Sequence, residues 1–128
     1  MSGKENRAHP RYALRWAVTI LIGSNGVGTS IEGQTHELSS HGCSILTERN
    51  CFTPEPIKLL LTMPPATPHR GFQPLEITAR MKYTLHSHKY GCFRIGIQFA
   101  EMADEVRHAL EQRLQIHAPL GVPKSKAA

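Results

Sequence analysis

The chain is short of aromatic residues and has no long apolar run, and both absences narrow its function. Aromatic residues make up 6% of its 128 residues, whereas small barrels that bind single-stranded nucleic acid need exposed aromatic side chains on which bases stack. No run of about eighteen apolar residues occurs, so the sequence predicts no transmembrane helix. Residues 1–10 also lack the apolar segment of a secretory signal. We therefore expect a cytoplasmic globular protein that does not insert into a membrane and does not have nucleic acid as its main ligand.

Cysteine is scarce as well. The three cysteines, Cys43, Cys51 and Cys92, are odd in number and form no CxxC pair. That pattern favours free thiols in a reducing compartment over a disulfide framework. Because Cys43 and Cys92 fall in segments with a strand-like pattern, the simplest interpretation of both is a buried thiol.

Familiar catalytic and metal-binding motifs are absent from the sequence. The glycine-rich stretch 23–30 is not followed by Lys-Ser or Lys-Thr, which makes it a turn rather than a phosphate-binding loop. Ser40 and His41 are only neighbours in sequence, which does not make a catalytic dyad, and no GxSxG elbow occurs. His86 and His88 would share a strand face, but no third ligand has a fitting spacing, which favours a solvated turn. We therefore expect neither an enzyme nor a metal or cofactor site.

The sequence has an excess of positive charge, and three of its arginines lie within the first fifteen residues. Lys and Arg outnumber Asp and Glu by 15 to 10, and the net charge of +5 favours an anionic partner. Arg7, Arg11 and Arg15 follow one another at a spacing of four. Pro10 interrupts any helix that would stack them, so residues 1–12 are expected to form an extended, flexible basic arm. Guanidinium groups bind phosphate in a bidentate manner and also stack on nucleobases.

Most of the chain alternates between apolar and polar residues, the pattern of half-buried β-strands. The first such stretch begins at Leu14 and places Trp16 on the buried face and Arg15 on the exposed face. The Asn-Gly pair inside residues 23–30 is typical of a hairpin turn. Polar or proline-rich loops separate the other strands, so that the sequence predicts six of them, at residues 14–22, 31–38, 43–47, 57–63, 75–85 and 93–99.

One segment near the end departs from this alternation. Apolar residues recur at every fourth position of residues 103–116, which predicts an amphipathic helix. Six strands followed by one helix indicate a mainly β protein, either a small antiparallel barrel or a sandwich. The expected organisation is one domain over residues 13–117 with a disordered tail over residues 118–128.

Two short motifs resemble the PilZ domain family. RAHPR supplies Arg7 and Arg11 in the RxxxR pattern of that family, and ELSSHG supplies Glu37, Ser39 and Gly42 in its [D/N]xSxxG pattern. The later stretch YGCFRIGIQFAEM resembles the closing strand of the family, so the likeness covers most of the chain.

The resemblance implies a six-stranded antiparallel β-barrel with a C-terminal helix that binds cyclic di-GMP, a bacterial second messenger. It implies that Arg7 and Arg11 hold phosphates and guanine faces. It also implies that Ser39 and the turn at Gly42 shape the pocket, and that Glu37 accepts hydrogen bonds from a guanine edge. It further implies a monomer or a ligand-linked dimer.

Three further residues are candidate ligand contacts, namely Asn6, His41 and Tyr83. Asn6 stands where many members of the family carry an additional arginine. Tyr83 stands near the end of the long strand where many members carry an aromatic residue that can stack on guanine. The alternation of residues 75–85, however, places Tyr83 on the core face, and the core interpretation is the preferred one.

Glu37 departs from the family pattern, which has Asp or Asn at this position. Glutamate keeps the charge but adds a methylene, which moves the carboxylate by about 1.5 Å. Loss of one charge-assisted hydrogen bond costs roughly 1.5–3 kcal/mol, or about ten- to a hundredfold in affinity. We therefore expect weakened rather than abolished ligand binding.

The sequence leads to two hypotheses. The first is a cyclic di-GMP receptor whose N-terminal arm becomes ordered around the ligand and relays the signal to an unidentified downstream protein in motility, polysaccharide or biofilm control. The alternative is a degenerate PilZ adaptor of type IV pilus assembly or motility that binds cyclic di-GMP weakly or not at all. The retained arginine pair supports the first hypothesis, and Glu37 supports the second.

Overall fold

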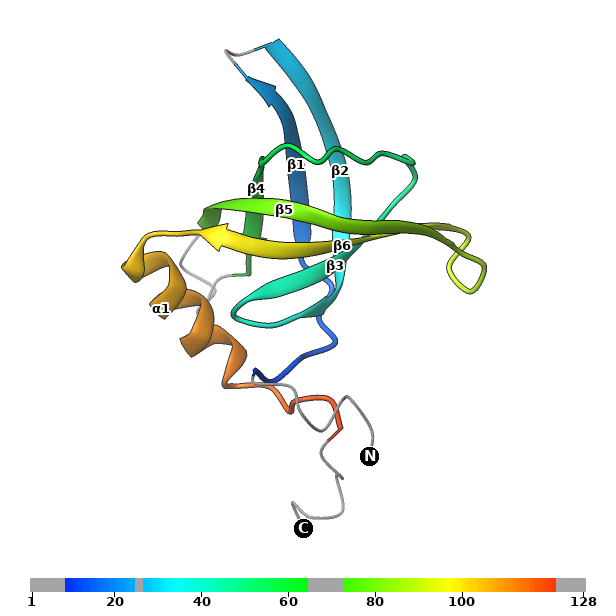
Figure 1. Cartoon of the computed structure of the whole chain (residues 1–128). Coiled ribbons are helices and arrows are strands. Elements are labelled where there is room, and N and C mark those ends of the chain that lie inside the picture. Colours follow the sequence, from blue (N-terminus) through cyan, green and yellow to red (C-terminus); the bar gives the residue numbers. More distant parts are fainter. Residues whose placement is uncertain (1–8, 25–26, 65–72, 122–128) are drawn as a thin grey trace.

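The computed structural model describes residues 9–24, 27–64 and 73–121. They form six strands and one helix: β1 (Ala17–Ser24), β2 (Val27–Leu38), β3 (Gly42–Thr47), β4 (Ile57–Met63), β5 (Gln73–Ser87), β6 (Cys92–Glu101) and α1 (Asp104–Leu114). The strands are antiparallel and close into a barrel in the order β1-β2-β3-β6-β5-β4 (Figure 1). The structure thus confirms the mainly β fold with one C-terminal helix and selects the barrel over the sandwich.

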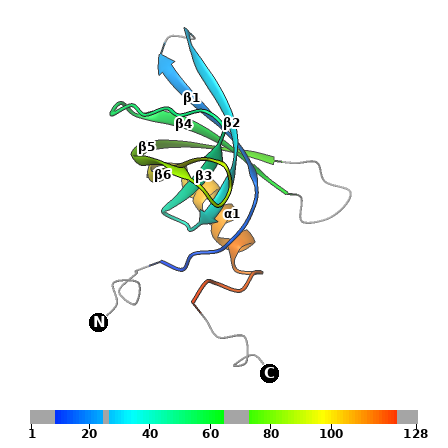
Figure 2. The ribbon, with the colours of Figure 1, turned by 90° about the vertical axis from the view of Figure 1, so that its right-hand side faces the viewer.

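The barrel interior is filled by the apolar residues of the alternating strands. Ile20, Ile45, Ile77 and Ile95, from four different strands, have no exposed surface. α1 packs against one end of the barrel (Figures 1 and 2), where Leu110 joins the same buried cluster. No helix in the described ranges has the length and apolar character needed to span a membrane.

The first strand begins three residues later than its alternation predicts. The hydroxyl of Thr35 donates to the carbonyl of Leu14 and accepts from the amide of Trp16 at 2.9 Å. Residues 14–16 therefore form hydrogen bonds with the Thr35 side chain where a strand would bond to a neighbouring backbone, and β1 starts only at Ala17. Trp16 is buried as predicted.

The second strand begins earlier than predicted, because the hairpin is longer. β1 and β2 pair from Ala17 with Gln34 up to Ser24 with Val27. The turn is therefore shorter than residues 23–30, and the Asn-Gly pair at 25–26 lies outside the described residues.

Two interruptions of the ladders decide which side chains face outward near the site. The register shifts between Thr35 and Glu37 on β2, and again between Met81 and Tyr83 on β5. A β-bulge adds one residue to a strand and reverses the alternation beyond it. Both shifts depend on how neighbouring strands pair.

Candidate functional site

The segment before β1 brings Arg11 to the end of β2. Tyr12 and Leu38 exchange two backbone hydrogen bonds, each 2.8 Å long, and the Tyr12 side chain is buried. From the other end of the described chain, the amide of Leu120 donates to the carbonyl of Arg11 at 2.6 Å. Arg11 is therefore held at its backbone while its side chain stays half-exposed. Asn6 and Arg7 lie outside the described residues.

The turn between β2 and β3 is built by the serine and glycine of the second motif. The Ser39 amide donates to the Gly42 carbonyl at 2.9 Å, and the Ser39 hydroxyl accepts from the His41 amide at 3.1 Å. A Cβ on Gly42 would lie 2.6 Å from the carbonyl oxygen of Ile97, so only glycine lets β3 approach β6 this closely. Both residues thus shape the turn.

Helix α1 supports the same turn from behind. Arg107 donates to the carbonyl of Ser40 at 2.7 Å. The ring of His41 stacks on that of His9, with centroids 3.5 Å apart and planes inclined by 13°. Desolvation, followed by electrostatic repulsion from His9 and Arg107, lowers the pKa of His41. The stacked rings of His9 and His41 therefore join the arm to the turn.

Glu37 faces Arg11 across the bulge. Its carboxylate Oε1 lies 3.6 Å from a guanidinium nitrogen of Arg11, and the two side chains are 29% and 37% exposed. The Glu37 amide donates to the hydroxyl of Ser44 at 3.2 Å. The two motifs thus meet as an ion pair, which at this exposure contributes roughly 0–1 kcal/mol.

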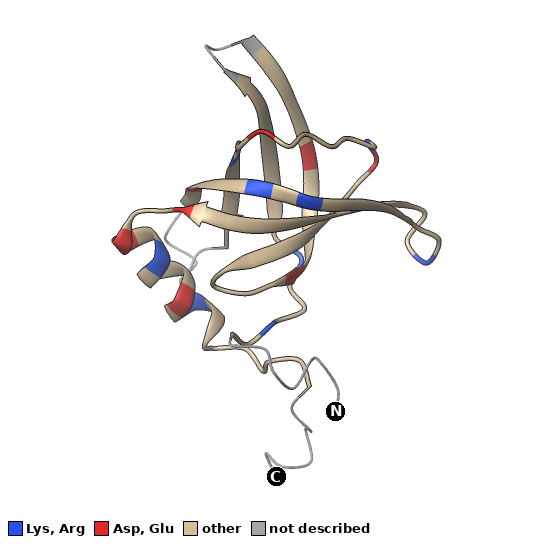
Figure 3. Cartoon of the chain, in the orientation of Figure 1, with Lys and Arg blue, Asp and Glu red and all other residues tan. Residues whose placement is uncertain are grey.

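A shallow pocket of about 260 Å³ opens between the turn, β5 and β6. Its wall contains the backbone and side chains of the turn together with two cations and one aromatic ring, among them Arg11, Ser39, His41, Gly42, Lys82 and Tyr83. Figure 3 shows Lys or Arg both on β5 and on the segment that leads into β1. Two cations, a flat ring and exposed backbone groups are what a nucleotide needs, since its phosphates and its base require different partners.

Tyr83 is not a core residue, and the preferred interpretation of the alternation was wrong at this position. The shift after Met81 pairs Tyr83 with Gly96 on the outside of the barrel and turns Thr84 to the side of Ile95 instead. Tyr83 is 39% exposed and Leu85 is 41% exposed. Because Gly96 has no side chain, the phenol ring lies directly on it, and a Cβ there would come within 2.1 Å of the ring. The bulge therefore delivers an aromatic face to the pocket.

A basic and aromatic cluster lies beside the two motifs. The guanidinium of Arg15 lies 4.9 Å from the ring centre of Tyr90, and the hydroxyl of Tyr90 lies 3.3 Å from the imidazole of His36. Burial, and then the positive charge of Arg15, lower the pKa of His36. Arg15 is exposed as predicted. Its guanidinium contacts Tyr90, and Arg15 does not line the pocket that Arg11 borders.

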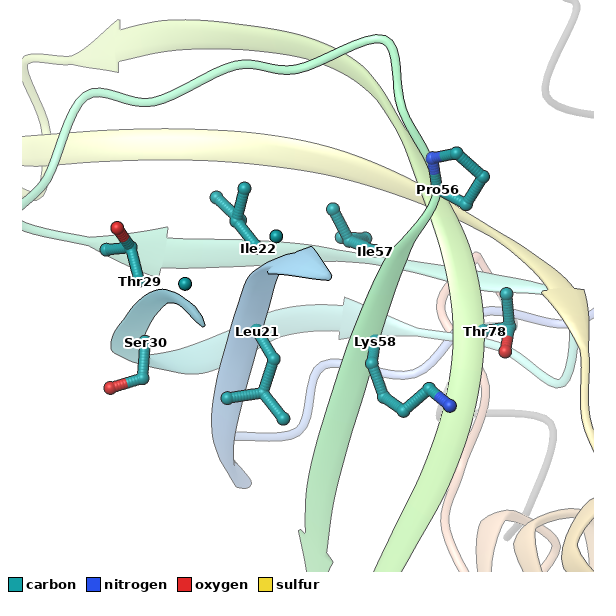
Figure 4. Close-up of a pocket in the computed structure, with 10 residues that line it drawn as sticks. Leu21, Ile22, Thr29, Ser30, Pro56, Ile57, Lys58 and Thr78 are labelled. Atoms are coloured by element: carbon teal, nitrogen blue, oxygen red, sulfur yellow. The ribbon is translucent and has the colours of Figure 1, made fainter. Parts of the chain in front are cut away.

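A larger and more apolar cavity lies elsewhere and contains neither motif. It has a volume of about 480 Å³ between the β1–β2 hairpin and the start of β4, where Ile22, Pro56 and Ile57 meet (Figure 4). His86 and His88, the pair considered as metal ligands, are exposed, and their ring centroids lie 4.8 Å apart. Across the described part of the chain, no group of three His, Cys, Asp or Glu side chains is arranged to hold a metal ion.

The structure thus brings most of the expected site residues to one place. Arg11, Ser39, Gly42, His41 and Tyr83 all border the pocket, whereas Glu37 reaches it only through Arg11. Sequence patterns missed the residues that β5 and β6 contribute, above all Lys82, Gly96 and Gln98. Their outward direction follows from alternation, but their nearness to the turn depends on strand order.

Comparison with known proteins points to one family. The model of the PilZ domain matches residues 5–115. Among solved structures, the chain resembles the Bacillus subtilis inhibitor of motility MotI/DgrA with a TM-score of 0.68 and 18% identity, over 86% of this chain and 51% of that one. It also resembles the PilZ domain of Escherichia coli YcgR with c-di-GMP, with a TM-score of 0.54 and 13% identity, over 84% of this chain and 87% of that one.

A third similar structure is the K. pneumonia MrkH–c-di-GMP complex, with a TM-score of 0.56 and 16% identity, over 86% of this chain and 50% of that one. The chain therefore spans about half the length of MotI and MrkH. At these identities the likeness concerns the fold. No curated protein sequence matches the chain. Since the family model covers most of the chain and the closed six-stranded barrel with its C-terminal helix agrees with it, the protein belongs to the PilZ domain family.

Proposed function

We propose that the protein is a non-enzymatic cytoplasmic receptor for cyclic di-GMP that acts on a separate downstream protein. The observation that carries the proposal is the pocket where Arg11, the turn Ser39–Gly42 and Tyr83 meet. Arg11 and Lys82 supply charge for a phosphate, and Tyr83 supplies a face for a guanine. Family membership supports the same ligand, as do the c-di-GMP complexes of YcgR and MrkH.

The ion pair between Arg11 and Glu37 is compatible with this role. A surface pair contributes roughly 0–1 kcal/mol, whereas a hydrogen bond to a charged group contributes about 1.5–3 kcal/mol. A phosphate can therefore take Arg11 from Glu37. Glu37 therefore competes with the ligand for Arg11, which is a different task from accepting hydrogen bonds from guanine.

Calorimetric titration with cyclic di-GMP tests the binding step. Arg11→Ala and Arg7→Ala are each expected to weaken binding by about ten- to a hundredfold, the value of one charge-assisted contact. Arg15→Ala is the matched control, because Arg15 lies against Tyr90 and should leave affinity unchanged. No heat with the unmodified protein, or equal losses in Arg15→Ala and Arg11→Ala, would contradict the proposal.

The relay step is that ligand binding orders the N-terminal arm. Trypsin cleavage after Arg7 is expected to slow when cyclic di-GMP is added, while cleavage after Lys124 in the C-terminal tail keeps its rate. Equal rates at Arg7 with and without ligand would leave a receptor without this relay.

The ion pair also favours a second candidate, a PilZ adaptor that binds protein and not cyclic di-GMP. In that case Arg11 and Glu37 are permanent partners. Glu37→Asp separates the candidates, because the shorter side chain releases Arg11. A gain in ligand affinity supports the receptor, and no binding by either form supports the adaptor.

A further inference from the structure

The β1–β2 hairpin carries a strand edge that no other strand of the barrel covers. β2 is 12 residues long, yet β3 pairs with it only from Gln34 to Leu38. Along Val27–Gly33, β1 is the one strand of the described chain that pairs with β2. The upper ends of β1 and β2 extend away from the rest of the barrel in both views (Figures 1 and 2).

Two hydrogen bonds show which backbone groups of this edge point away from β1. The Thr35 amide donates toward Trp16, on the side of β1. The Glu32 carbonyl points to the other side, where it accepts from the hydroxyl of Thr47 at 3.0 Å. Since peptide groups alternate along a strand, Gly28 and Ser30 also direct their amides and carbonyls away from β1. Both residues are exposed.

Nothing in the sequence of this edge blocks the addition of a strand. Proteins protect open edges with lysine, proline, bulges or a covering segment. The stretch Val27–Gly33 has no lysine, arginine or proline, and its one charge, Glu32, accepts a hydrogen bond from Thr19 at 3.0 Å. A groove of about 790 Å³ runs beside Ser30 and Glu32, so there is room along the edge.

We propose that this edge pairs with the same edge of a second copy, which makes the protein a dimer with a four-stranded ribbon β1-β2-β2-β1. The groove carries both signs of charge, with Glu32 and Glu48 beside Arg15 and Arg49. A surface of mixed sign suits a copy of itself better than a strongly charged partner. A two-stranded ribbon is also marginal by itself, and four strands stabilise it.

The register follows from the outward groups. Antiparallel pairing centred on Ser30 sets Ser30 against Ser30 of the second copy and Gly28 against Glu32, so that outward groups meet outward groups. The Glu32 carbonyl, which already accepts from Thr47, uses its second lone pair for the Gly28 amide. It also sets Thr29 opposite Ile31, and two β-branched residues make a favourable cross-strand pair. Centring on Glu32 would place two carboxylates opposite each other, which is unfavourable. The dimer does not involve the nucleotide pocket, so it stands or falls separately from the proposed function.

Sedimentation of the full chain over a wide range of concentration tests the proposal. The mass is expected to rise from the monomer value of 14.3 kDa toward twice that value. Ser30→Pro removes the central amide from both copies without removing a bond to β1, and proline is tolerated at strand edges. It should weaken association by about tenfold or more, whereas Ser30→Ala keeps the amide and should associate like the unmodified protein.

Amide signals of the unmodified protein give a second readout that needs no variant. The Ser30 amide is expected to shift and to gain exchange protection as the protein is concentrated, while the Ile31 amide, which already faces β1, stays constant. A constant monomer mass would overturn the proposal and would leave this edge to a strand of a different protein. A dimer with equal association of Ser30→Pro and Ser30→Ala would overturn it as well.

Discussion

Gly96→Ala is expected to damage the pocket proposed for cyclic di-GMP without damaging the barrel. In the structure the ring of Tyr83 lies on Gly96, and a Cβ at that position would come 2.1 Å from one ring carbon and 2.5 Å from two others. Carbon atoms in contact sit about 3.5–4.0 Å apart, so the ring must move by roughly 1.5 Å or more. The half-exposed ring can do so, and it then leaves the place where it would stack on a guanine.

The size of the effect separates binding from stability. Stacking of one base on an aromatic side chain is worth about 1–3 kcal/mol, which corresponds to roughly five- to 150-fold in affinity. The barrel itself loses little, because replacing a strand glycine with alanine gains about 0.5–1 kcal/mol of backbone entropy. We therefore expect a large loss of cyclic di-GMP affinity with a nearly unchanged free energy of unfolding.

A double-mutant cycle checks the mechanism. Tyr83→Ala should lose a similar factor in calorimetric affinity, and Gly96→Ala combined with Tyr83→Ala should lose no more than Tyr83→Ala alone, since the two changes remove one interaction. Urea titration of all three variants serves as the fold control. Unchanged affinity in Gly96→Ala, or losses that add in the double variant, would refute the role given to the Tyr83 ring.

Three other predictions concern the folded barrel. Leu110 has no exposed surface, so Leu110→Ala should lower the free energy of unfolding, measured in urea, by about 2–5 kcal/mol. As a control, the same change at the exposed Gln112 should alter that free energy by about 0.5 kcal/mol or less. Similar values for both variants would contradict the packing of α1. Burial raises the pKa of Cys43 to about 12, so iodoacetamide should not label Cys43 in the native protein and should label it after unfolding. Fast labelling of the native protein, detected by peptide mass spectrometry, would disprove the burial of Cys43. The pKa of His36 lies below the ordinary 6.5 because of burial and Arg15. The unfolded chain therefore binds more protons below that pH, and the free energy of unfolding falls on acidification. His36→Gln should flatten the dependence of that free energy on pH, and an identical dependence would show that His36 is not its source.

The free thiols follow the sequence pattern in part. Cys43, Cys51 and Cys92 are free, and Cys43 is buried as predicted. Cys92, at the first position of β6, is only half-buried, because it pairs with Ser87 at the far end of the ladder. Alternation predicts which face a residue takes, but the length of the neighbouring strands decides whether that face is covered.

Local periodicity determined the strands, the helix and most of the core of this protein, since the two-residue period of a strand is a property of the backbone. Ile77, Ile95 and Leu110 are buried where the pattern predicted. The RxxxR and ExSxxG motifs also marked the family before any contact was known, and Arg11, Ser39 and Gly42 do border one pocket.

Tertiary structure alone decided how the pocket is completed. The shift after Met81 turned Tyr83 outward, and the shift after Thr35 brought Glu37 to Arg11. Each shift arises from the pairing of strands that are distant in sequence, and one inserted residue reverses the faces beyond it. The strand order β3-β6-β5 then set Lys82 beside the turn at Gly42. Because such contacts depend on strand order and register, which no local pattern encodes, only the folded chain could place them.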